Sequence, residues 1–174
     1  PTIFHSPGCF TVTSAGTANF AAAAATCPKR TVRPLGLCVT TLSLAEHSPT
    51  LVILELGAND GLRGLKPQLL ADNLGAMIDA ARDAGAHVLL VGMRMPPNYG
   101  PAYTRRFAAV FADVAEAKQV PLVPFLLDGF ADRPELFLPD GIHPTAEAQP
   151  RIVDTVWTGL RPLLASQGTK AARK

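Results

Sequence analysis

The ten residues from Leu51 to Asp60 constrain the fold more than any other stretch of this sequence. Six mostly apolar residues, Leu-Val-Ile-Leu-Glu-Leu, run directly into Gly-Ala-Asn-Asp. A short apolar run that stops at glycine and polar residues is typical of a buried strand in a parallel sheet. Ligands of open α/β sheets bind beyond the carboxyl ends of the strands, so Asn59 and Asp60 stand where a functional site is expected. The structural alternative is a tight turn formed by Gly57 and Gly61 and capped by Asn59.

After residue 44, predicted strands alternate with predicted helices. Short apolar runs indicate strands at Leu51–Leu56, His87–Val91 and Val120–Val123. Apolar residues recur at helical spacing in three segments between or after them, 67–84, 101–118 and 145–164. This alternation predicts an α/β fold in which the three strands are parallel neighbours covered by helices. A loop is expected at 93–100, and a long connection with a possible helical turn at 126–139.

Residues 1–45 differ from the rest of the chain in composition and in apolar pattern, and they are expected to be irregular. They contain no acidic residue, hold all three cysteines and show no sustained apolar period. By β-propensity, short strands are expected at Phe10–Thr13 and Leu37–Thr40. The alanine-rich run in the twenties favours a helix. The odd number and the spacing of the cysteines match neither a zinc site nor a redox motif.

The distribution of charge argues against a nucleic-acid partner. The formal net charge is +2, but residues 46–169 carry ten basic and fourteen acidic residues. A basic tail, 166–174, contains Lys170, Arg173 and Lys174, and we interpret it as a solvated end. No apolar run is long enough to span a membrane, and no secretory signal is visible. The oligomeric state is not indicated.

Asp140-Gly141-Ile142-His143-Pro144 is the second informative motif. An aspartate and a histidine three residues apart can lie side by side, the carboxylate accepting from one imidazole nitrogen. That contact orients the ring and leaves its other nitrogen free to act as a base. Two other interpretations stay open: a helix-start motif with a solvated Asp140, and a pair of metal ligands. The metal interpretation is the weaker one, because no further His or Cys lies at a suitable spacing.

Three motifs in order resemble the SGNH hydrolase superfamily, also called GDSL esterases. They are residues 55–64, residues 94–100 and the motif at Asp140–Pro144, and they look most like the bacterial thioesterase I, lysophospholipase and arylesterase branch. The resemblance covers about residues 44–165 of a single domain, 1–174. It implies a three-layer α/β/α, flavodoxin-like fold. It also implies hydrolysis of small-molecule acyl esters or thioesters without metal or cofactor, in the periplasm or outside the cell.

The resemblance also implies roles for individual residues. His143 would be the general base, Asp140 its orienting partner and Asn59 a donor to the oxyanion. A side-chain amide suits that last role because it is a neutral donor aimed at developing charge. The loops at 61–64 and 94–100 would wall the acyl site.

The nucleophile is where the sequence departs from the family pattern. The family's serine follows Gly-Asp near the N-terminus, and no Gly-Asp-Ser occurs here. Neither Ser6 nor Ser14 has that context, and Ser43 and Ser48 lie too near the Asn59 strand. The glycine that would supply a second oxyanion donor is not identified either.

We hypothesise that residues 1–45 are not the family's native front end, through a frame change or a truncated gene model. A Gly-Asp-Ser in another reading frame upstream would support this, and its absence from all three frames would exclude it. The chain as written is then expected to have little or no esterase activity. The rival hypothesis is a non-catalytic α/β domain that retains the acyl pocket. A flavodoxin-like nucleotide binder is disfavoured because no glycine-rich phosphate loop is present.

Overall fold

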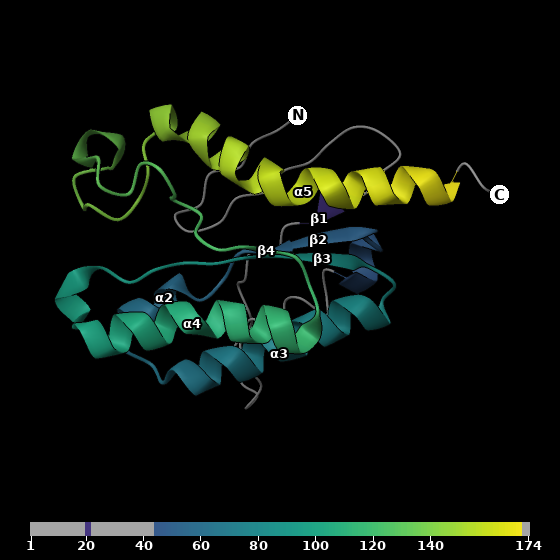
Figure 1. Ribbon diagram of the computed structural model, residues 1–174, viewed down its shortest axis with the longest axis horizontal. Coiled ribbons are helices and arrows are strands. Elements are labelled where there is room, and N and C mark those ends of the chain that lie inside the picture. Colours follow the sequence, from purple (N-terminus) through teal and green to yellow (C-terminus); the bar gives the residue numbers. More distant parts are fainter. Residues whose placement is uncertain (1–19, 22–43, 172–174) are drawn as a thin grey trace.

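The computed structural model describes residues 20–21 and 44–171, with side chains at 44–165. These residues form three layers, a four-stranded sheet with helices on both faces (Figure 1). All strand pairs are parallel, in the order β1-β2-β3-β4. The α/β/α architecture predicted from the sequence is confirmed. Within the described residues, no helix is both long enough and apolar enough to cross a membrane.

Three strands follow the predicted apolar runs: β3 has the predicted bounds, β2 and β4 are shorter, and β1 was not predicted. The strands are β1, Phe20–Ala21; β2, Leu51–Leu54; β3, His87–Val91; and β4, Leu122–Val123. β2 and β3 pair in register from Leu51↔His87 to Leu54↔Leu90. β4 has only two residues because Pro121 and Pro124 flank it and neither has an N–H for the ladder.

The helices lie close to the predicted segments. α3, Pro67–Asp83, and α4, Pro101–Lys118, both begin with proline, which suits the first helical position. α5 runs over Gln149–Ala171 behind the single turn η3, Ala146–Ala148, so it extends beyond the predicted end at 164. Two further 3₁₀ turns lie in the predicted loops, η1 at Pro97–Tyr99 and η2 at Pro134–Leu136.

The helix expected in the alanine-rich run was wrong at Phe20 and Ala21, the two residues of this run that the structure describes. Phe20 and Ala21, in the alanine-rich run, pair in parallel with Leu51 and Val52 as β1. Sheet pairing therefore overrides the helix propensity of alanine at these two positions. The remainder of that run and the predicted strands at 10–13 and 37–40 lie outside the described residues. Because β1 is only two residues long, it covers half of β2.

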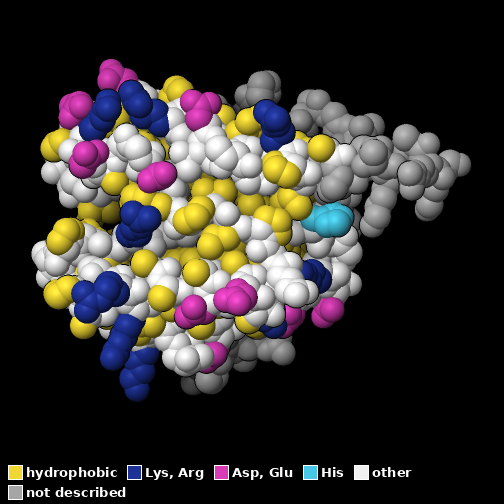
Figure 2. All heavy atoms as spheres, in the orientation of Figure 1, with side chains coloured by type: hydrophobic (Ala, Val, Ile, Leu, Met, Phe, Trp, Pro, Cys, Tyr) yellow, Lys and Arg dark blue, Asp and Glu magenta, His cyan; other side chains and the backbone are white. Residues whose placement is uncertain are grey.

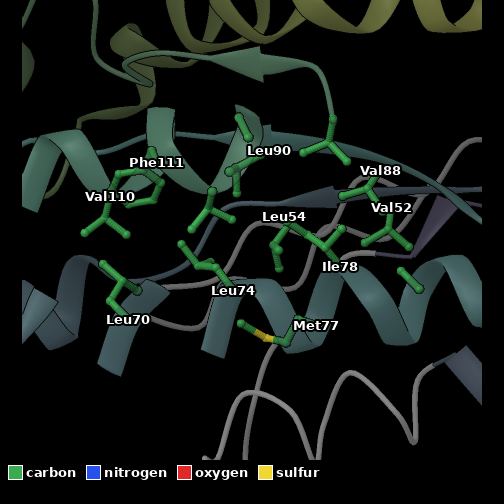
Figure 3. Packing of buried hydrophobic residues seen from close by; sticks show 14 of the residues in the cluster. Val52, Leu54, Leu70, Leu74, Met77, Ile78, Val88, Leu90, Val110 and Phe111 are labelled. Carbon is green, nitrogen blue, oxygen red and sulfur yellow. The ribbon is translucent and has the colours of Figure 1, made fainter. Parts of the chain in front are cut away.

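The sheet separates two hydrophobic clusters. Below it in Figure 1, α3 and α4 pack against side chains of β2 and β3, and Figure 3 shows Leu74 and Ile78 of α3 among Leu54, Val88 and Leu90. Above it, α5 covers the second cluster, which includes Leu89, Val91, Phe130 and Ile152. Both layers project past the carboxyl ends of the strands, and that edge carries the predicted site residues.

Candidate active site

Asp140 and His143 are in direct contact. Nδ1 of His143 lies 2.7 Å from Oδ2 of Asp140. The other carboxylate oxygen, Oδ1, accepts from the backbone N–H of Ile142 at 2.9 Å and of His143 at 3.0 Å. The aspartate is therefore held by backbone donors while it holds the ring. About half of each side chain is exposed, so the pair is open to solvent and to a substrate.

A closed loop places this pair. Phe137 and Pro144 form an isolated antiparallel bridge. Across it, the N–H of Leu138 donates to the carbonyl of His143 at 2.7 Å, and the N–H of Thr145 donates to that of Leu136 at 2.8 Å. At the tip, the chain turns through Gly141, whose φ of +67° is costly for other residues.

The electrostatics of the pair define the ionisation state of Asp140. The hydrogen bonds from the His143 backbone and side chain, together with the Ile142 N–H, lower the pKa of Asp140 from 3.8 to about 2. The carboxylate is thus charged at any physiological pH and can only accept hydrogen bonds. Nδ1 of His143 must then carry the proton, which leaves Nε2 of the neutral ring as an acceptor. This is the arrangement of a general base with an orienting acid.

Asn59 lies in a short helix at the end of β2. This helix, α2, spans Ala58–Leu62, and its N-cap is Gly57 with a φ of +111°. The structural alternative, in which Asn59 caps a tight turn, was therefore wrong, because the cap is two residues earlier, at Gly57, and Asn59 is inside the helix. The Asn59 side chain is exposed.

Two tyrosines, Tyr99 of η1 and Tyr103 of α4, hold the end of α2. Tyr99 donates its hydroxyl to the carbonyl of Leu62 at 2.9 Å, and Tyr103 donates to Leu65 at 2.9 Å and to Gly61 at 3.2 Å. The Gly61 carbonyl also accepts from the backbone N–H of Gly64 at 2.9 Å, so Tyr103 is its second donor, while Leu65 lies just beyond the helix. Burial and the nearby Asp60 carboxylate raise the pKa of Tyr103, so it remains a donor.

Both halves of the site lie at the carboxyl edge of the sheet. α2 follows β2, and the Asp140–His143 loop belongs to the connection between β4 and α5 (Figure 1). That Asn59 faces His143 across this edge stays a prediction. The sequence did not identify Glu55, just after β2, as an acid that the fold partly removes from solvent. Burial raises its pKa from 4.5 to about 7.

No serine side chain described by the structure lies at this edge. Ser48 is the one serine in the segment 44–165, and it precedes β2 at the amino ends of the strands. The prediction that Ser48 is unsuited as nucleophile is consistent with this position. Ser6, Ser14 and Ser43 lie outside the described residues.

The described residues hold no metal-binding group at the pair, and a small hollow of the fold lies apart from it. Within 20–21 and 44–171, His, Cys, Asp and Glu do not gather in any group of three or more suited to a metal ion. A hollow of about 170 Å³ lies beside β4, between Phe125, Asp128 and Thr155. The guanidinium of Arg94 stacks 4.6 Å from the centre of the Phe125 ring at its rim. Asp140, His143 and Asn59 do not line this hollow.

Comparison with known proteins gives consistent matches. The model of the GDSL-like Lipase/Acylhydrolase family matches residues 13–150, so the match begins inside the segment with the atypical texture. "Esterase TesA" of Pseudomonas aeruginosa is 48% identical over 129 residues, which are 74% of this chain and 64% of that protein. "Thioesterase 1/protease 1/lysophospholipase L1" of Escherichia coli K12 is 39% identical, over 74% of this chain and 62% of that protein. The chain thus spans somewhat less than two thirds of these relatives.

Solved structures agree with the sequence matches. The crystal structure of TesA superposes with a TM-score of 0.71 at 47% identity, covering 73% of this chain and 71% of that one. The psychrotrophic esterase EstA from Pseudoalteromonas sp., inhibited by monoethylphosphonate, superposes with a TM-score of 0.70 at 34% identity, over 74% and 70% of the two chains. The resemblance inferred from the three motifs is confirmed.

Proposed function

Because the chain belongs to the GDSL-like lipase/acylhydrolase family, we propose that its site is built to hydrolyse acyl esters or thioesters by a serine-type mechanism. The observation that carries the proposal is the 2.7 Å contact between Nδ1 of His143 and Oδ2 of Asp140. It leaves Nε2 as a base at the carboxyl edge of a parallel sheet, where substrates of such folds bind. The names of the relatives, esterase, arylesterase and thioesterase, support this substrate class.

In this mechanism His143 removes the proton of an attacking serine and then returns it to the leaving alcohol or thiol. Asp140 holds the ring in the required tautomer and stabilises the imidazolium that forms. The Asn59 amide donates to the oxygen of the tetrahedral intermediate as it becomes negative. No cofactor takes part in the proposal. By the same family likeness, the protein acts in the periplasm or outside the cell.

The experiment is labelling with a fluorophosphonate, followed by mass mapping of the modified residue. Such reagents phosphonylate a serine, with loss of fluoride, only when a base activates it, so a label at one serine identifies the nucleophile. His143→Ala is expected to abolish labelling. Ser48→Ala is the matched control and is expected to change nothing, because Ser48 precedes β2 at the other edge of the sheet.

One observation favours a second candidate, an inactive acyl-binding domain of the same fold. The described side chains at the carboxyl edge include no serine, and without an attacking hydroxyl the pair retains only a small residual rate. Absence of any label, together with saturable binding of a fatty acid, would select this candidate. Absence of both would contradict both proposals.

A further inference from the structure

Charge is segregated across the carboxyl edge of the sheet. Apart from Asp60 in α2, the layer with α2 and the start of α4 is basic: the segments 61–71 and 101–112 contain no acid and carry Arg63, Lys66, Arg105 and Arg106. The opposite layer, 124–148, has five acidic residues against Arg133 alone. In Figure 2, Lys and Arg side chains gather at the lower left beside hydrophobic ones, whereas the upper left carries Asp and Glu side chains together with Lys or Arg ones.

The basic layer also exposes two large aliphatic side chains. Leu65 is 38% exposed, and Leu69, in the first turn of α3, is 45% exposed. The hydroxyl of Tyr103 bonds the Leu65 carbonyl and so joins this segment to the first turns of α4, next to Arg105. Arg63, Lys66, Leu65, Leu69, Arg105 and Arg106 together are called the basic-apolar patch.

The cations of the patch are free to meet an external anion. In the described part of the chain, the carboxylates that form ion pairs contact Lys118, His47 and His143. None contacts Arg63, Lys66, Arg105 or Arg106, and all four are exposed. None of these four cations therefore has an ion-pair partner among the described side chains.

We propose that the basic-apolar patch docks this protein on the surface of an anionic lipid bilayer. Cations interspersed with exposed leucines are the pattern of a surface that pairs with lipid phosphates while its apolar side chains reach the acyl boundary. A single-stranded nucleic acid fits less well, because such sites present aromatic rings for base stacking. Here the rings of Tyr99 and Tyr103 are turned to the protein, with their hydroxyls on backbone carbonyls.

The separation of basic and acidic residues also determines how the protein would be oriented on the bilayer. The acidic layer is repelled by the same surface, so the molecule tilts with α2 toward the bilayer and the 124–148 layer away from it. The docking does not depend on the proposed hydrolysis, since none of the six residues belongs to the Asp140–His143 pair. A protein without esterase activity is expected to dock equally well.

The test is co-sedimentation with vesicles. Vesicles of phosphatidylcholine with phosphatidylglycerol should bind the protein, pure phosphatidylcholine should not, and added salt should release it. Arg105→Glu combined with Arg106→Glu should weaken binding more than tenfold, since each cation near an anionic surface contributes roughly a fivefold factor. Leu65→Glu should also weaken it. Arg161→Glu and Val153→Glu, both exposed on α5, are the matched controls and should bind like the wild type.

Circular dichroism of each variant confirms that it is folded before binding is compared. Three results would each overturn the proposal: no binding to anionic vesicles, equal binding to neutral ones, or full binding by the patch variants. A single-stranded oligonucleotide that competes as well as the vesicles would also overturn it, because the patch would then be a general polyanion surface.

Discussion

The hydroxyl of Tyr103 lies 2.9 Å from the carbonyl oxygen of Leu65, so a side chain of α4 fixes the backbone just beyond the helix that holds Asn59. A second bond of the same hydroxyl, to Gly61 at 3.2 Å, reaches the last turn of α2 itself. The position of the proposed oxyanion donor is thus set by another helix of the same layer, about forty residues further along the chain.

Removal of the tyrosine hydroxyls should loosen α2. Tyr103→Phe is expected to lower the free energy of unfolding by about 1–2 kcal/mol, because it removes two hydrogen bonds to backbone carbonyls. Tyr99→Phe removes one bond rather than two, so it should cost less. Urea denaturation ranks the two variants, and amide exchange at 63–65 should quicken in both. Equal stability of Tyr103→Phe and the wild type would contradict this account of α2.

Loss of either member of the Asp140–His143 pair should abolish most catalysis in a preparation that a fluorophosphonate labels. His143→Ala is expected to lower kcat by orders of magnitude, since such residues act as a unit. Asp140→Asn, which no longer holds the Nδ1 tautomer, should cost about 10⁴, as in other Ser-His-Asp sites. Steady-state hydrolysis of a p-nitrophenyl ester measures both. An Asp140→Asn variant with unchanged kcat would remove the proposed role of Asp140.

Truncation of Asn59 tests the oxyanion role separately. Asn59→Ala is expected to lower kcat by roughly 10²–10³ and to leave KM nearly unchanged, because the bond strengthens only in the transition state. Asn59 is exposed, so the stability of the variant should stay close to that of the wild type. A rise in KM alone would indicate that Asn59 binds the ground state instead.

The pH dependence of stability should reflect Glu55. Its pKa is raised to about 7 in the fold, whereas the unfolded chain titrates near 4.5. The folded state therefore binds more protons between these values, and stability falls as pH rises from about 4.5 to 7. Glu55→Gln should remove this fall and raise stability at pH 8 by about 1–3 kcal/mol.

Asp140 gives stability the opposite dependence on pH, in a lower pH range. Its pKa is lowered to about 2, so the stability that it contributes is present above 3.8 and is lost as pH falls toward 2. Denaturation midpoints at several pH values separate the two effects. A Glu55→Gln variant with the wild-type slope between pH 5 and 7 would show that another group causes it.

Two glycines should respond oppositely to the same substitution. A Cβ at Gly92 would clash with the carbonyl oxygen of Pro124, which is backbone and cannot move easily. Gly92→Ala is therefore expected to destabilise the fold by about 2 kcal/mol or more. In α3, a Cβ at Gly75 would lie 3.3 Å from Cε of Lys118, a flexible chain end. Gly75→Ala should be neutral or should stabilise by up to about 1 kcal/mol. Thermal unfolding of both variants provides the comparison.

Periodicity in the sequence predicted the layers well, because each buried strand and each amphipathic helix carries its own local pattern. β1 was missed because the alanine-rich run that begins at these residues favours a helix locally, and the pairing of Phe20 and Ala21 with Leu51 and Val52 depends on distant parts of the chain. The predicted third strand was too long, although Pro121 and Pro124 already excluded ladder donors at its ends.

The candidate site, too, was predictable from the sequence only in part. The contact of Asp140 with His143 was predictable because three residues separate them. The helix around Asn59 was not, because a five-residue helix between two glycines has little intrinsic preference and is held by tyrosines about forty residues away. The burial of Glu55 and the segregation of charge likewise appear only once the layers are assembled.

The closed loop from Leu136 to Thr145 has a consequence for the order of folding. Its hydrogen bonds join residues at most nine positions apart, so their loop-closure entropy is small and they can form early. The bonds that hold α2 span 37 to 42 positions and must wait for α4 to dock. A partly folded chain would thus possess its acid–base pair before its oxyanion donor. Activity should then be the last property to return on refolding, later than the protection of the His143 amide.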